Sequence, residues 1–164
     1  MTTDDDDQIE WNREVRGETP TQQLDRNWLA LLQELRVVQT GVQLLTGFLL
    51  TLPFQSRFED LSARGHGIYL VTVSASTMAT ILLVAPVGMH RLLFRRRAIG
   101  VLVTAGNRLA IGGIAMLGVT LVGAVALTFE IVIGPAAALP AAAVVTVLLI
   151  GFWYLMPRAA RPRI

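Results

Sequence analysis

Cysteine and lysine are both absent from this 164-residue chain. Without cysteine, the chain can form neither a disulfide framework nor a thiolate metal site nor a redox pair. The signatures HExxH, GxSxG and a glycine-rich phosphate loop are also missing. We therefore expect a protein that is not an enzyme, needs no cofactor or metal, and has no nucleic-acid partner.

Apolar sequence, in contrast, is abundant, with 53% hydrophobic residues. A membrane-spanning helix needs about 20 consecutive apolar residues. Three stretches are long enough and a fourth is weaker, and these predicted spans cover about residues 68–87, 110–133, 136–156 and, for the weaker one, 37–54. The pattern predicts an all-α fold, a four-transmembrane-helix bundle without a separate soluble domain.

The arginines are sorted between these spans. Twelve of the fourteen precede the first span, separate the second from the third, or follow the fourth, and only Arg57 and Arg64 lie on the other side. Positive residues collect on the cytoplasmic side of membrane proteins. Arginine usage without lysine also favours a GC-rich bacterial genome. We therefore expect a multi-pass protein of the bacterial cytoplasmic (plasma) membrane with both termini in the cytoplasm.

The two ends of the chain differ from the middle. Residues 1–18 are acidic and polar, with an aspartate run at Asp4 to Asp7 that lacks the glycine and the spaced ligands of a calcium loop. This segment has too few apolar side chains to order itself, so we expect a disordered cytoplasmic tail that could bind a protein partner. Residues 157–164 form a basic cytoplasmic tail, and residues 19–156 form the four-helix domain.

The first helix has a clear start signal. Thr19 suits the N-cap, Pro20 the first helical position, and Gln22 completes a capping box. We expect the helix to run unbroken into the first span and to end at Pro53. Its length of about 50 Å exceeds the ~30 Å hydrocarbon core, so its first half extends into the cytoplasm.

The first span carries polar residues on one helical face, namely Gln33, Arg36, Thr40, Gln43 and Gly47. A helix does not turn amides to lipid without a partner, so this face should meet other helices or another subunit. We therefore expect a homo-oligomer. In later spans, the glycines of residues 106–123 should allow close backbone contact, and Pro86 and Gly88 should mark the end of the second span.

Six residues are candidates for a polar transport path, and each also has a structural interpretation. Gln39, Thr40 and Gln43 could line a path or hold helices together. Glu34 could relay protons or pair with an inner-loop arginine, and Arg36 could bind a lipid phosphate. Glu130 could bind a proton or a cation; alternatively, it reaches water or caps the tight loop that follows it.

The run "HRLLFRRR" is the densest basic segment. Its histidine could sense pH, but binding of anionic head groups explains the arginines more simply. The candidate lipid-binding residues are His90, Arg91, Arg95, Arg96 and Arg97.

The strings "NWLALLQELRVVQTGVQLLTGFLLTLPFQSRF", "APVGMHRLLFRRR" and "NRLAIGGIAMLG" carry a resemblance that covers roughly residues 27–156. The chain resembles an actinobacterial family of small four-helix membrane proteins of unknown function, often labelled sodium:proton antiporter. The resemblance implies a four-helix membrane fold and cation exchange, and it transfers no site residue. Two hypotheses result: a small cation- or proton-linked transporter, and a non-transporting scaffold that binds anionic lipid or a partner complex.

Overall fold

The computed structural model describes residues 10–11, 13–93 and 99–160, and all regular structure within these ranges is helical. Residues 10–11 and 13–16 are helical. The elements that follow are α2 (Pro20–Thr51), the 3-10 turns η1 (Leu52–Phe54) and η2 (Ser56–Phe58), α3 (Ala63–Leu93), α4 (Ile99–Val132), α5 (Pro135–Leu149), the π-helical η3 (Ile150–Leu155) and α6 (Met156–Ala159). The Asp4–Asp7 run and the arginines at 95–97 lie outside the described residues.

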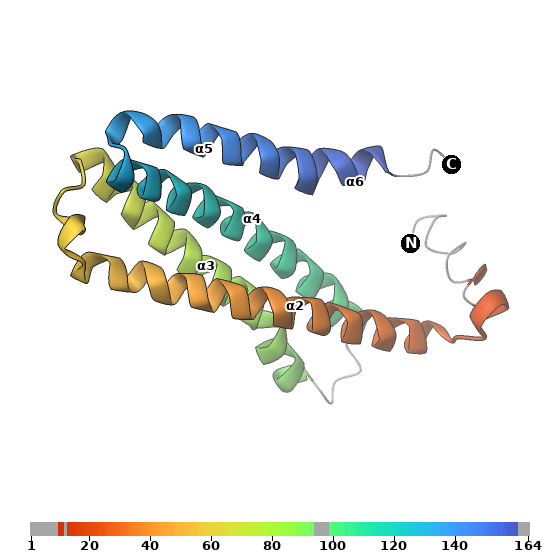
Figure 1. The fold of residues 1–164 in the computed structure, drawn as a ribbon. Helices are drawn as coiled ribbons and strands as arrows, with labels where there is room; N and C mark the ends of the chain where they lie inside the picture. Colours follow the sequence, from red (N-terminus) through yellow and green to blue (C-terminus); the bar gives the residue numbers. More distant parts are fainter. Residues whose placement is uncertain (1–9, 12, 94–98, 161–164) are drawn as a thin grey trace.

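The long helices pack side by side as an antiparallel bundle (Figure 1). Four helical segments in the described ranges are long and apolar enough to cross a membrane. The predicted all-α four-transmembrane-helix fold is therefore confirmed. The α2–α3 and α4–α5 connections lie at one end, here called the distal end. The start of α2 and the end of α6 lie at the opposite, terminal end.

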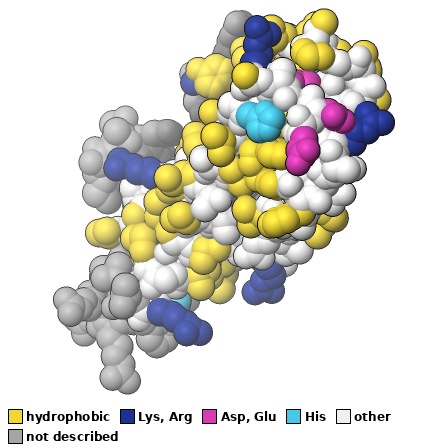
Figure 2. Space-filling model, turned by 90° about the vertical axis from the view of Figure 1, so that its left-hand side faces the viewer, with side chains coloured by type: hydrophobic (Ala, Val, Ile, Leu, Met, Phe, Trp, Pro, Cys, Tyr) yellow, Lys and Arg dark blue, Asp and Glu magenta, His cyan; other side chains and the backbone are white. Residues whose placement is uncertain are grey.

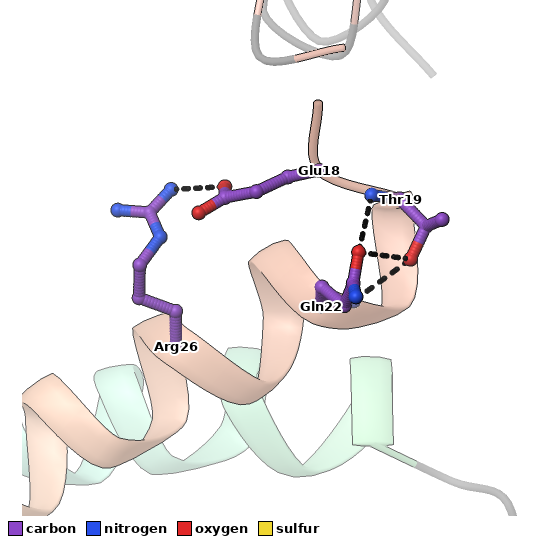
Figure 3. A network of polar contacts seen from close by, with 4 residues as sticks. All are labelled: Glu18, Thr19, Gln22 and Arg26. Carbon is purple, nitrogen blue, oxygen red and sulfur yellow. Dashed lines mark hydrogen bonds and ion pairs between the residues drawn. The ribbon is translucent and has the colours of Figure 1, made fainter. Parts of the chain in front are cut away.

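The predicted start of the first helix is confirmed in detail. Thr19 is the N-cap of α2, and the backbone N–H of Gln22 donates to its Oγ1 at 3.3 Å. In return, the backbone N–H of Thr19 donates to Oε1 of Gln22 at 2.9 Å, and Arg26 pairs with Glu18 at 3.0 Å (Figure 3). From this cap, α2 continues without a break to Thr51, and Pro53 lies in the turn that ends it.

One face of α2 forms its contact with the rest of the bundle. The buried residues Trp28, Leu35, Val42 and Leu49 recur every seven positions, and partly buried leucines and a valine alternate between them, namely Leu24, Leu31, Val38, Leu45 and Leu52. This 3-4 spacing is typical of the contact face of a coiled coil. We call these nine residues the α2 seam. Its middle part packs in one cluster with Ala79 and Leu83 of α3 and Ala110 of α4, and consists of Leu31, Leu35, Val38 and Val42.

Helices α3 and α4 approach each other closely because glycines face larger side chains. A Cβ added at Gly113 would lie 2.6 Å from Cγ of Leu83, and one added at Gly123 would overlap Thr72. Small residues allow such close contact between membrane helices. The expectation that these glycines permit close backbone contact is confirmed.

Helix α3 continues through Pro86 to Leu93, and the end of the second membrane span near Pro86 and Gly88 stays a prediction. A proline removes one backbone donor and disturbs the turn before it. In that turn, the carbonyl of Leu83 accepts a hydrogen bond of 2.5 Å from Nε2 of Gln39 on α2. The N–H that Pro86 lacks would have bonded to the Leu82 carbonyl, so the bond from Gln39 is an additional contact between α2 and α3 and does not replace the lost one.

The close α3–α4 contact predicts an asymmetry between two adjacent glycines. Gly113→Ala should lower the free energy of unfolding by about 1–3 kcal/mol because the new methyl group overpacks against the fully buried Leu83. Gly112→Ala should be nearly neutral, since its Cβ would lie at an ordinary 3.5 Å from Leu82. Denaturant titration of both variants in bicelles measures the difference. Equal effects would contradict the packing described.

Candidate functional site

The polar side chains of α2 divide between two faces of the helix. On the inner face, Gln39 bonds to the Leu83 carbonyl, and the hydroxyl of Thr46 bonds to that of Ser76 on α3. Near the distal end, the hydroxyl of Tyr69 on α3 donates to the Leu49 carbonyl of α2 at 3.3 Å. These bonds connect α2 to α3, so Gln39 acts as an interhelical contact.

On the opposite face lies the polar row predicted from the sequence, here called the outer stripe: Gln33, Arg36, Thr40, Gln43 and Gly47, all exposed in this single chain. The hydroxyl of Thr40 donates to the Arg36 carbonyl at 3.1 Å and is satisfied within its own helix. Gln43, in contrast, has no hydrogen-bond partner among the described residues, and nothing lies within 4 Å of a Cβ at Gly47. The stripe therefore meets no other helix of the same chain.

Glu34 lies beside the stripe, in a groove between α2 and α4 at the terminal end. The groove has a volume of about 400 Å³, and its polar lining comes from Asn27, Glu34, Thr104 and Asn107. Among the described residues, Glu34 forms no ion pair. Sequence reasoning missed this polar groove, although Asn27 and Glu34 are seven residues apart and thus share a helical face.

Glu130 is instead held at the distal end. It lies in the last turn of α4 and is only 5% exposed. Its Oε1 accepts hydrogen bonds from the backbone N–H of Ser62 at 3.0 Å and from the Ser62 hydroxyl at 2.6 Å. Ser62 Oγ also accepts from the Gly65 N–H at 3.0 Å, as an N-cap residue does. Glu130 thus ties the end of α4 to the start of α3.

This geometry corrects one interpretation of Glu130. The carboxyl group does not reach water, and it caps α3 rather than the tight turn after α4. An oxygen acceptor suits this position because the first backbone N–H groups of a helix have no partner within the helix. The carboxyl group lies directly over Gly65, and a Cβ at that position would displace it. The second carboxyl oxygen, Oε2, is buried without a partner among the described residues.

The six candidate path residues therefore do not converge. Glu34 lies about 25 Å from Thr51 along α2 at 1.5 Å per residue, whereas Glu130 lies at the distal end, beyond Thr51. Gln39 points inward, and Arg36, Thr40 and Gln43 are exposed on the outer stripe. No continuous row of these side chains runs through the bundle.

The candidate lipid-binding run is described only in part. His90, in the last turn of α3, stacks on Trp28 with ring centroids 5.4 Å apart. Arg91 is exposed beside it, whereas Arg95, Arg96 and Arg97 lie outside the described residues. Within the described ranges, no group of three His, Cys, Asp or Glu side chains could hold a metal ion.

The contact between Glu130 and Ser62 predicts non-additive effects of mutation. Glu130→Ala should lower the free energy of unfolding by about 1–3 kcal/mol because it leaves the Ser62 donors unpaired. Ser62→Ala should cost less, and the double variant should lose less than the sum, since both changes remove the same bond. Glu59→Ala, an exposed acid at the same end, is the control. Strictly additive losses in bicelle unfolding would refute the contact.

Comparison with known proteins finds one family match. A family of unknown function (DUF6328) matches residues 17–157, which includes all four long helices. No curated protein and no solved structure matches the chain. Because the matched region spans most of the sequence, the chain belongs to this family of unknown function, DUF6328.

Proposed function

We propose that the protein is a non-enzymatic, self-associating membrane protein that acts as a scaffold for lipids or a partner complex. One observation carries this proposal: the amide of Gln43 is exposed on the outer stripe with no partner among the described residues of its own chain. A second copy, placed with its own stripe against the first, would supply that partner.

The depth of Gln43 makes such a partner necessary. Gln43 lies about 12 Å from Thr51 along α2, and the hydrocarbon core is about 30 Å thick, so its amide lies near the middle of the membrane. Lipid tails offer no hydrogen bond there. An amide both donates and accepts, so two Gln43 side chains can pair across a two-fold axis. Gly47, one turn away, leaves space for the approaching helix.

The orientation and the other partners belong to the same proposal. The terminal end faces the cytoplasm of a bacterium, because twelve of the fourteen arginines belong to that side. There, the segment from His90 to Arg97 binds anionic head groups, at about 1 kcal/mol per basic residue near the surface. The acidic segment at residues 1–18 is the contact for a protein partner.

The proposal predicts that one amide controls association. Gln43→Leu should weaken self-association by about 1 kcal/mol, or roughly fivefold, because bonds between membrane helices contribute about 0.6 and up to about 1.7 kcal/mol. Gln39→Leu is the matched control: it should lower the stability of the single chain and leave association unchanged. Energy transfer between labelled copies diluted in vesicles measures both. A wild-type chain that stays monomeric would refute the proposal.

A second candidate is the cation- or proton-linked transporter implied by the family resemblance. The position of the outer stripe favours a transporter whose ion path lies between two copies of the chain. If two stripes meet, Arg36, Thr40 and Gln43 line the boundary between copies, and Glu34 lies beside its cytoplasmic mouth. An ion path would then run between two copies and not through one bundle.

Flux through vesicles separates the two candidates. The scaffold proposal predicts that the reconstituted protein moves no more protons than empty vesicles under sodium, potassium or proton gradients, as read by an enclosed pH-sensitive dye. The transporter candidate predicts flux that falls in both Glu34→Gln and Gln43→Leu, with Glu59→Gln as the unaffected control. Reproducible wild-type flux with this pattern would overturn the scaffold proposal.

A further inference from the structure

A second surface feature lies on the side of the bundle formed by α3, α4 and α5. It is an open groove of about 550 Å³, within the range of about 300–1,000 Å³ of ligand pockets. Small residues form much of it, including Gly123 and Ala126 of α4 and Ala138 of α5. Ile68 and Val71 of α3 and Leu139 of α5 add apolar surface. The groove therefore suits a flexible hydrocarbon chain.

One charged side chain lines this groove. Arg64 lies in the first turn of α3, at the distal end, where acidic, basic and histidine side chains gather on the surface (Figure 2). The exposed acids Glu59 and Asp60 are close in sequence, yet Arg64 forms no ion pair within the described residues. Its guanidinium group is therefore free to bind an anion at the mouth of the groove, and a phosphate offers a bidentate partner.

We infer that this groove binds one acyl chain of an anionic phospholipid, whose phosphate contacts Arg64. The lipid belongs to the leaflet at the distal end, away from His90 and Arg91 at the end of α3. The lining of the groove indicates both parts of the ligand. Its apolar surface fits a hydrocarbon chain, and Arg64, which forms no ion pair within the described residues, fits a negative head group.

The dimensions agree with a lipid of a single leaflet. Arg64 and Thr72, both part of the lining, are about 12 Å apart along α3. Half of the hydrocarbon core is about 15 Å thick. A chain that begins at Arg64 and follows the groove therefore ends near the middle of the membrane. This inference does not depend on the outer stripe, which lies on α2.

Tryptophan quenching by lipids with brominated acyl chains tests the site directly. Val71 lines the groove, whereas Leu70 is equally exposed on the same helix but does not line it. In vesicles, tryptophan introduced by Val71→Trp should be quenched by brominated phosphatidylglycerol about fivefold more effectively than by brominated phosphatidylcholine, as expected for one arginine near a head group. Leu70→Trp should show no such preference. The emission of the three native tryptophans is subtracted with the wild-type chain.

Two pairs of substitutions, each with its control, test which residues bind the head group and the acyl chain. In the Val71→Trp background, Arg64→Gln should abolish the preference for the anionic lipid, whereas Arg57→Gln, at the same end but outside the groove, should keep it. Ala142→Leu should fill the groove and reduce quenching by both lipids, whereas the exposed neighbour Ala143→Leu should not.

Three results would overturn the inference. The first is an equal preference for the anionic lipid at positions 70 and 71, and the second is a preference that survives Arg64→Gln. The third is occupation of the groove by a second copy of the chain. The last is detectable because the chain has no cysteine. Complete disulfide formation between two copies of Val71→Cys in membranes would show that protein, not lipid, covers the groove. Absence of that disulfide, together with the quenching pattern, supports the lipid.

Discussion

Hydrocarbon offers no hydrogen bond to a polar group, and the arrangement of the bundle follows from this constraint. Several polar side chains inside the bundle are paired. Thr46 bonds to Ser76, Gln39 to the Leu83 carbonyl, and Thr120 to the Met116 carbonyl of its own helix. On the outer stripe, the amide of Gln43 lies about 12 Å from Thr51 along α2 and has no partner among the described residues. A hydrogen-bond partner for this amide would have to come from outside the single chain.

The packing explains why α2 cannot rotate to bring the amide of Gln43 into the bundle. Its seam repeats every seven residues from Leu24 to Leu52, so rotation of α2 would remove large side chains from their packing against α3 and α4. Close contact between α3 and α4, through Gly113 and Gly123, supplies the surface on which this seam rests. On the other side, α5 packs against α4 (Figure 1). The bundle thus presents two distinct lateral surfaces, a polar one on α2 and an apolar groove beside α5.

Much of the fold follows from local sequence signals. The capping box at Thr19 involves residues three apart, and hydropathy alone marks four spans. The seam is also visible in the sequence as a 3-4 repeat from Leu24 to Leu52. The bond between Glu130 and Ser62 could not be predicted, because the two residues are 68 positions apart and meet only through the α3–α4 register.

The orientation of α2 is the central claim, and collision accessibility of spin labels tests it most directly. Because the chain has no cysteine, single cysteines can be placed one at a time from Val38 to Leu50 and labelled in vesicles at high dilution. The structure predicts the lowest oxygen accessibility at positions 42 and 49, which are buried, and high values at 44 and 48, which are exposed. Accessibility at 42 and 49 equal to that at 44 and 48 would contradict the account.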